Sequence, residues 1–181
     1  MTTTILLVRH GETDWNAERR VQGHTDRPLN ETGRAQAREL ADELESTPLD
    51  AVYSSDLVRA HETARVVAER KGLAVTAVPG LREREFGTWE GLTDREILDR
   101  FPHAHHGPWG DGETPDEMSR RVLESLRRIA ETHEDETVLV VSHGGPLRAV
   151  LRHCGTAADG AIANCHVVRL EAREGILRPL D

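Results

Sequence analysis

Two histidines, each at the end of an apolar run and followed by glycine, are the residues of this chain best placed to do chemistry. His10 follows the run at residues 4–8, with Arg9 beside it, and His143 follows the run at residues 137–141. A run of this kind predicts a buried strand, and the glycine predicts the turn after it. Because ligands of α/β proteins bind at the carboxyl ends of strands, both histidines can meet on one ligand if their strands are neighbours.

The glycines beside these histidines indicate that the ligand is an anion. Gly11 has no side chain, so a ligand can come close to the backbone there. Gly144, Gly145 and Pro146 follow His143 and predict the start of a helix, where free N–H groups and the helix dipole attract negative charge. The alternative for this second motif is an ordinary structural turn.

Arg59 and Asn16 are further candidates for the same pocket. Arg59 lies one turn into a predicted helix over residues 56–70, which follows a short predicted strand at residues 51–53. Guanidinium groups match phosphate oxygens in a two-pronged geometry, although most helix arginines are simply solvated. Asn16 lies six residues beyond His10 and would offer an amide hydrogen bond, but by itself it is equally typical of a turn.

A proton donor or acceptor is expected in the charged segment at residues 81–91. Glu83, Glu85 and Glu90 are the candidates, and glycines and aromatic residues between them indicate an ordered loop over a site. The residue types alone do not choose among the three carboxylates. A solvated charged surface is the alternative interpretation.

The histidines of the central segment invite a metal-site interpretation that the spacing does not favour. His103, His105 and His106 lie in a predicted loop, and no carboxylate falls at a recognisable ligand spacing. We therefore expect surface histidines and no metal.

The pattern along the chain predicts a single α/β domain over residues 1–181. Its fold class is a three-layer sandwich with a mostly parallel central sheet flanked by helices. Residues 11–29 are expected to form a long loop. The other predicted strands are 73–78 and one or two within 162–170, and the other predicted helices are 31–46, a short one beginning at Thr93, 115–132 and 146–153.

Composition limits the partners of the protein. The net charge is −9, which argues against nonspecific binding to nucleic acid or to anionic membranes. Cys154 and Cys165 are the two cysteines, and no run of about 18 apolar residues occurs, so a reduced, cytoplasmic protein is expected. The oligomeric state stays open between a monomer and a homodimer.

Four blocks in chain order resemble the histidine phosphatase superfamily, also called the phosphoglycerate-mutase-like family. The resemblance covers most of the chain, and it implies the phosphoglycerate-mutase-like fold. The similar segments are Arg9-His10-Gly11-Glu12-Thr13 with Trp15-Asn16 and Gln22-Gly23; Ser54-Ser55-Asp56-Leu57 with Arg59-Ala60 and Glu62-Thr63-Ala64; Leu81-Arg82-Glu83 with Phe86-Gly87 and Trp89-Glu90-Gly91; and Ser142-His143-Gly144-Gly145.

The resemblance implies a mechanism without metal or other cofactor. His10 would attack phosphorus and carry the phosphoryl group as phosphohistidine, while Arg9, Arg59 and His143 would surround its oxygens. Glu83 matches the family's proton donor. The residues expected to bind substrate are Asn16, Gln22, Gly23 and Gly144.

Within this family the chain resembles the phosphatases more than the mutases. About 20 residues lie between Gly91 and Thr114, where mutases carry longer covering segments. Gly145 stands where mutases tend to have asparagine, and Phe86 where they tend to have tyrosine. We therefore expect hydrolysis of a small phosphorylated metabolite that the sequence does not name. The alternatives are a cofactor-dependent phosphoglycerate mutase and a phospholigand-binding protein without turnover.

Overall fold

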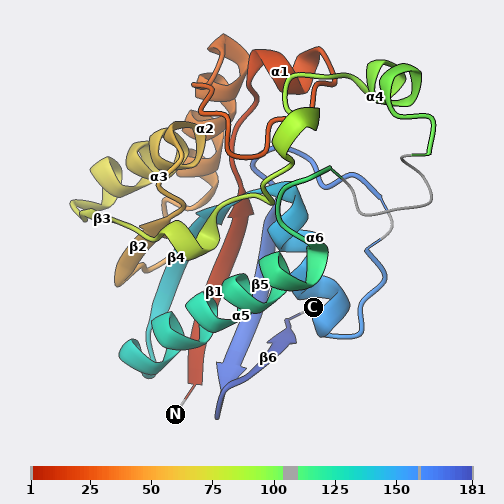
Figure 1. The fold of residues 1–181 in the computed structure, drawn as a ribbon. Coiled ribbons are helices and arrows are strands. Elements are labelled where there is room, and N and C mark those ends of the chain that lie inside the picture. The colour runs from red at the N-terminus through yellow and green to blue at the C-terminus, as the bar shows by residue number, and fades with distance from the viewer. Residues whose placement is uncertain (1, 104–109, 159, 181) are drawn as a thin grey trace.

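Six strands form one sheet in the computed structural model, which describes residues 2–103, 110–158 and 160–180 (Figure 1). The strands are β1 (Thr2–Arg9), β2 (Ala51–Ser54), β3 (Val75–Ala77), β4 (Thr137–Ser142), β5 (Val167–Arg173) and β6 (Ile176–Pro179). Their order is β3-β2-β4-β1-β5-β6. The first four strands pair in parallel, whereas β5 and β6 join one edge antiparallel. The predicted α/β class is confirmed.

Helices cover both faces of this sheet. They are α1 (Asp14–Ala17), α2 (Glu31–Glu43), α3 (Val58–Lys71), α4 (Asp94–Arg100), α5 (Pro115–Thr132) and α6 (Gly144–His153), with short 3₁₀ turns η1 (Pro79–Leu81) and η2 (Gly87–Trp89). Thr93 and Thr114 begin α4 and α5 with reciprocal capping boxes, as their sequences predict. Across the described residues, no helix combines the length and the apolar character needed to cross a bilayer.

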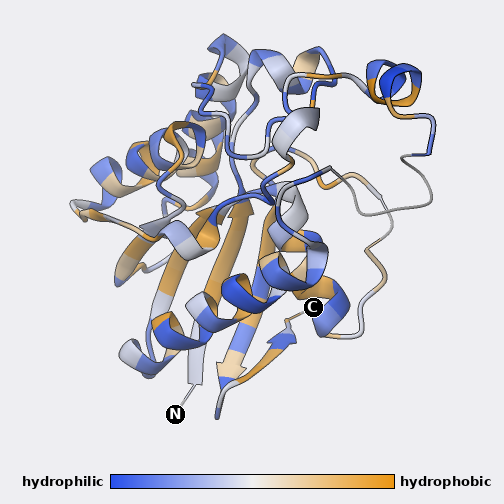
Figure 2. Ribbon diagram, in the orientation of Figure 1, coloured by the Kyte–Doolittle hydropathy of each residue, from blue (hydrophilic) through white to orange (hydrophobic). Residues whose placement is uncertain are grey.

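Strand β1 divides the apolar core into two layers, because successive side chains point to opposite faces of a sheet. Ile5 and Leu7 pack with α5 and α6, and Leu6 and Val8 pack with α2 and α3. Figure 2 shows the apolar strands lying between amphipathic helices. Burial on both faces explains why β1 and β4 read as continuous apolar runs.

The register of β1 against β4 sets the position of the two histidines. Arg9 pairs with Ser142 at the carboxyl ends of these parallel neighbours. The N–H of His10 continues the pairing by donating to the carbonyl of Ser142 over 3.0 Å. His10 and His143, each one residue beyond its strand, therefore leave the sheet side by side.

Within the described residues, the structure differs from the predicted elements at four main places. The expected loop at 11–29 contains α1, which Thr13 caps through a box completed by Asn16 instead of Glu or Gln. The strand expected from residue 162 or 165 begins only at Val167, as β5. Residue 162 is not in a strand, and Cys165 has a φ of 56°, which is not a strand conformation. The hairpin strand β6 was not predicted, and α6 begins two residues before Pro146.

Core packing under α5 gives a test of this fold. Leu126 is fully buried in the layer between α5 and the sheet. We expect Leu126→Ala to lower the free energy of unfolding by about 2–5 kcal/mol, through lost burial and the remaining cavity. Chemical denaturation measures this loss. Leu180→Ala, at a side chain that is 40% exposed, is the matched control and should cost less than half as much; equal losses would contradict this packing.

Candidate active site

The imidazoles of His10 and His143 lie in contact at the carboxyl end of the sheet. Their ring centroids are 5.0 Å apart and the rings are inclined at 62°. His10 is 3% exposed and His143 is fully buried. Asn164 adds a support by donating its amide to the carbonyl of His10 over 2.8 Å. Two residues 133 positions apart in the chain thus line one small site, as their motifs predict.

Hydrogen bonding defines the tautomer of His10. Its Nδ1 lies 2.6 Å from the carbonyl oxygen of Gly11, which can only accept, so Nδ1 carries the proton. Nε2 therefore keeps its lone pair. Gly11 is itself held, because its N–H donates to the Oγ1 of Thr63 over 3.0 Å. The ring is oriented with a free nitrogen before any ligand arrives.

The surroundings of both rings favour their neutral form. Burial lowers the pKa of His10 well below its ordinary value of 6.5, and the positive charges of Arg59 and Arg9 lower it further. Burial also lowers the pKa of His143 well below this value, with further contributions from Arg59 and His10. At neutral pH His10 is therefore an uncharged imidazole next to fixed cations.

Arg59 is a fully buried cation at the site. Its Nη2 donates to the carbonyl of Gly23 over 2.8 Å, and its Nη1 donates to that of Thr25 over 3.1 Å. Burial lowers its pKa to about 10, partly offset by Glu83, so the group stays charged at neutral pH. The loop carbonyls fix the guanidinium but do not neutralise it.

Arg9 brings a second cation to the same place. Its Nη1 donates to the carbonyl of Ile162, so the non-strand backbone at this residue serves to hold the arginine. Burial lowers the pKa of Arg9, while Glu83 acts in the opposite direction. A Cβ added to Gly144 would lie 3.6 Å from the Nε of Arg9, which shows how close α6 begins to this guanidinium.

Several buried polar atoms of these residues have no hydrogen-bond partner among the described residues. They include the Nε of Arg9, the Nε of Arg59 and both ring nitrogens of His143. Buried polar groups are almost always paired, so a cluster of unpaired ones indicates a ligand. Two guanidinium groups among them favour an anion such as a phosphate.

Glu83 is the carboxylate that the structure brings to this cluster. Its Oε2 accepts from the N–H of Gly145 over 3.0 Å, at the first turn of α6, and its Oε1 accepts from the N–H of Arg84 over 2.9 Å. Glu90 instead holds a loop, accepting from the N–H groups of residues 24 and 25, and Glu85 is exposed. The position of Glu83 favours it over the other two carboxylates, and its role as proton donor stays a prediction.

Glycine is required at position 145 for this contact. A Cβ there would lie 2.0 Å from the Oε1 of Glu83. Any larger residue at 145 must displace the flexible carboxylate.

The four residues expected to bind substrate all lie next to the cluster. Asn16 accepts through Oδ1 from the N–H of Thr13 over 3.1 Å, and Gln22 accepts from the hydroxyl of the same threonine over 2.9 Å. Gly23 presents its carbonyl to Arg59, and Gly144 faces Arg9. Their contacts with a ligand stay predictions.

Two supporting residues received no role in the sequence analysis. Thr63 links α3 to the turn after His10, and Asn164 links the segment before β5 to the same turn. A threonine on the same helix face as Arg59, four residues along, was an available signal for the first. Nothing in the local pattern identifies the second.

The suspected histidine cluster does not add to this site. His103 is exposed, and His105 and His106 lie outside the described residues. Among the residues that the structure describes, no group of three or more His, Cys, Asp or Glu side chains is arranged to hold a metal ion.

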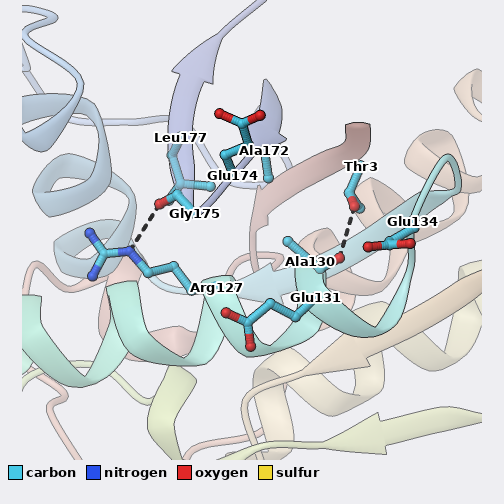
Figure 3. Close-up of a pocket in the computed structure, with 9 residues that line it drawn as sticks. All are labelled: Thr3, Arg127, Ala130, Glu131, Glu134, Ala172, Glu174, Gly175 and Leu177. Carbon is cyan, nitrogen blue, oxygen red and sulfur yellow. Dashed lines mark hydrogen bonds between the residues drawn. The ribbon is translucent and has the colours of Figure 1, made fainter. Parts of the chain in front are cut away.

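A second hollow lies away from the site, near the amino end of β1 (Figure 3). Its volume is about 120 Å³, and Glu131, Glu134 and Glu174 line it together with Arg127. Figure 3 shows the side chain of Arg127 directed to the carbonyl of Gly175. Its acidic lining does not suit a phosphate ligand.

A neutral imidazole beside buried cations, at the carboxyl end of an α/β sheet, is suited to binding an anion and to phosphate chemistry. A metal-independent phosphoserine phosphatase of Arabidopsis thaliana is 40% identical over 185 residues, covering 95% of this chain and 77% of the relative. Phosphoglycerate mutase-like protein 4 of the same plant is 40% identical over 166 residues, covering 85% and 72%. The structure of a mycobacterial glucosyl-3-phosphoglycerate phosphatase matches with a TM-score of 0.86 and 30% identity, over 98% of this chain and 96% of that one.

The model of the histidine phosphatase superfamily (branch 1) matches residues 5–178, and the chain belongs to this family. Membership confirms the resemblance seen in the four motifs. It also confirms the predicted class of enzyme, a phosphatase.

The buried neutral histidines predict a dependence of stability on pH. The folded-state pKa of His143 lies below the unfolded value near 6.5, so protonation favours the unfolded chain. The contribution of neutral His143 to stability is fully present above about pH 6.5. As the pH decreases below 6.5, this contribution is lost by up to about 1.4 kcal/mol per pH unit.

We therefore expect the wild type to lose about 1 kcal/mol more unfolding free energy than His143→Gln between pH 7.5 and 5.5. Denaturant titrations in phosphate-free buffer measure this difference. His103→Gln, at an exposed histidine, should keep the wild-type dependence. Parallel pH profiles for the wild type and His143→Gln would contradict the assignment.

Proposed function

We propose that this chain hydrolyses phosphomonoesters through a phosphohistidine on His10. The observation that carries the proposal is the neutral, oriented imidazole of His10 beside buried cationic groups that lack protein partners. A phosphoryl group placed there would accept from Arg9, Arg59 and His143 while its phosphorus faces the free Nε2. Position and charge are the two contributions that phosphoryl transfer requires.

In the first step the lone pair of Nε2 forms a bond to phosphorus as the bond from phosphorus to the ester oxygen breaks. Glu83 gives its proton to the departing oxygen, so an alcohol leaves. The negative charge on the equatorial oxygens is stabilised by Arg9 and Arg59. The carbonyl of Gly11 accepts from Nδ1–H and stabilises the positive ring that forms.

In the second step a water molecule gives a proton to the carboxylate of Glu83 and attacks phosphorus. The bond between phosphorus and Nε2 breaks, the electron pair returns to the ring, and inorganic phosphate leaves. Glu83 ends protonated and His10 neutral, so the cycle is complete. General acid–base help of this kind contributes about 10²–10⁴-fold.

Charge for this reaction comes from protein side chains, so the proposed hydrolase works without a metal or other cofactor. The substrate is a small phosphorylated metabolite, supported by relatives named for phosphoserine and for glucosyl-3-phosphoglycerate.

We infer that residues 1–181 act as one domain, since a single sheet unites the described elements. A cytoplasmic location stays a prediction, supported by the free thiols of Cys154 and Cys165. Monomer and homodimer both stay open.

The mutase is the second candidate, because phosphoglycerate mutase-like protein 4 is as similar as the phosphoserine phosphatase. The sequence favours hydrolysis, since Gly145 stands where mutases tend to have asparagine. Incubation with 3-phosphoglycerate and 2,3-bisphosphoglycerate should release inorganic phosphate. Efficient formation of 2-phosphoglycerate with little phosphate release would favour the mutase.

Removal of the nucleophile distinguishes an enzyme from a binding protein. His10→Ala should lose at least about 10³-fold in kcat on p-nitrophenyl phosphate, because no group remains to accept the phosphoryl. When a reaction with a ³²P-labelled substrate is rapidly quenched, the wild type should carry acid-labile covalent ³²P. The His10→Ala variant should carry none.

The control is His103→Ala, which also tests the rejected metal interpretation. It should keep wild-type activity, and activity should survive EDTA. Full turnover by His10→Ala, or the same label in both proteins, would overturn the proposed mechanism.

The contact between Glu83 and Gly145 gives an independent test of the proton donor. We expect Gly145→Ala to lower kcat by about 10–100-fold, because the added Cβ displaces the carboxylate. Stability should change little, since the displaced group is the end of a flexible side chain. Gly160→Ala is the matched control, because no atom of the described residues lies within 4 Å of a Cβ there. Unchanged kcat in Gly145→Ala would remove Glu83 from the mechanism.

A further inference from the structure

A cavity of about 310 Å³ opens beside Glu83, on the side where the ester oxygen of a substrate would leave. Its lining residues are Glu83, Arg84, Phe86, Pro115, Met118, Gly145, Arg148 and Arg152. Glu83 thus belongs both to the phosphate cluster, which it forms with Arg9, His10, Arg59 and His143, and to the wall of this cavity. This space is therefore the nearest one open to a group attached to the ester oxygen that Glu83 would protonate.

Two arginines of α6 give the cavity a positive wall. Gly145, Arg148 and Arg152 are three and four residues apart, so they follow one face of the helix from its first turn. The Nη1 of Arg148 lies 3.5 Å from the position of a Cβ on Gly144, and the Nε of Arg9 lies 3.6 Å from the same point. Arg148 therefore directs its charge toward the phosphate cluster.

This arrangement places the like charges of Arg9 and Arg148 close together, and Glu83 is the one carboxylate among the described residues that line the cavity. Neither Arg148 nor Arg152 forms an ion pair with a carboxylate of the described residues. Arg148 is one of the groups that lower the pKa of Arg9, as a nearby cation must. Repulsion between neighbouring guanidinium groups is relieved when an anion lies between them.

The rest of the wall is suited to a short carbon chain. Phe86, Pro115 and Met118 contribute apolar surface, and the guanidinium carbon of Arg84 lies 4.2 Å above the ring of Phe86. At roughly 30 Å³ per water molecule, the cavity holds about ten waters, so a three-carbon acid fits.

We propose that this cavity is the leaving-group subsite and that Arg148 and Arg152 bind a second anionic group of the substrate there. The preferred substrates are small phosphomonoesters whose alcohol carries a carboxylate or a second phosphate. This proposal rests on the hydrolase proposed above and adds the substrate class. The relatives' named substrates, phosphoserine and glucosyl-3-phosphoglycerate, both carry a carboxylate.

Matched substrate pairs test the proposal on the wild-type chain. 3-Phosphoglycerate and glycerol 3-phosphate have the same carbon number and differ by a carboxylate against a hydroxymethyl group. The bisphosphate and monophosphate of propane-1,3-diol form the second pair. We expect kcat/KM to favour the member with the second anionic group in at least one pair, by about tenfold or more. The pair that shows the preference identifies the second anion.

Variants then locate the preference. Arg152→Gln, at an exposed residue, and Arg148→Gln should each reduce the ratio of kcat/KM within that pair by about tenfold. Arg65→Gln is the matched control for loss of one positive charge, since Arg65 is exposed on α3 and lies outside the lining of this cavity. It should leave the ratio unchanged.

The failures of the two proposals are distinguishable through p-nitrophenyl phosphate, which has no second anion. Hydrolysis of this ester with equal kcat/KM within both pairs would overturn the subsite and leave the hydrolase intact. The subsite would also be overturned if Arg65→Gln reduced the ratio of kcat/KM within the pair as much as Arg152→Gln does. Absence of hydrolysis for every ester, including p-nitrophenyl phosphate, would overturn both proposals.

Discussion

The parallel pairing of β1 with β4 is the constraint on which the rest of the site depends. Its register, Arg9 opposite Ser142, makes the two strands end together and places the rings of His10 and His143 in contact. Because side chains alternate along a strand, a slip by one residue would reverse the faces that β1 presents to both core layers. Apolar packing on both sides of the sheet therefore fixes the geometry of the phosphate cluster.

The site is maintained against its own electrostatic cost. Arg59 is fully buried, its hydrogen-bond partners are carbonyls, and nearby carboxylates such as Glu83 only partly offset the cost of burying its charge. The unpaired nitrogens of His143 add a further penalty, because buried polar atoms without partners lose hydration and gain nothing. Aliphatic packing of the sheet must offset these costs. Binding of a phosphate would satisfy the same atoms, so the features that cost stability also prepare the site for its ligand.

The sequence predicts the strand ends and the helix starts better than it predicts contacts between distant segments. Apolar runs locate both histidines, and the capping boxes locate α4 and α5, because those signals are local. Helix α1 was missed since Asn16 replaces the usual Glu or Gln of the box. The pairing of Glu83 with Gly145 joins residues 62 positions apart, and spacing along the chain carries no trace of it. The family resemblance, rather than the residue types, selected Glu83.

The outermost strands of the sheet bear on how copies of this chain can associate. β3 has three residues and β6 has four, and Pro179 in β6 offers no N–H for another ladder. Such short borders give an approaching strand little to pair with, so continuation of the sheet from one molecule into the next is disfavoured. We therefore expect association between copies of this chain to leave each six-stranded sheet separate.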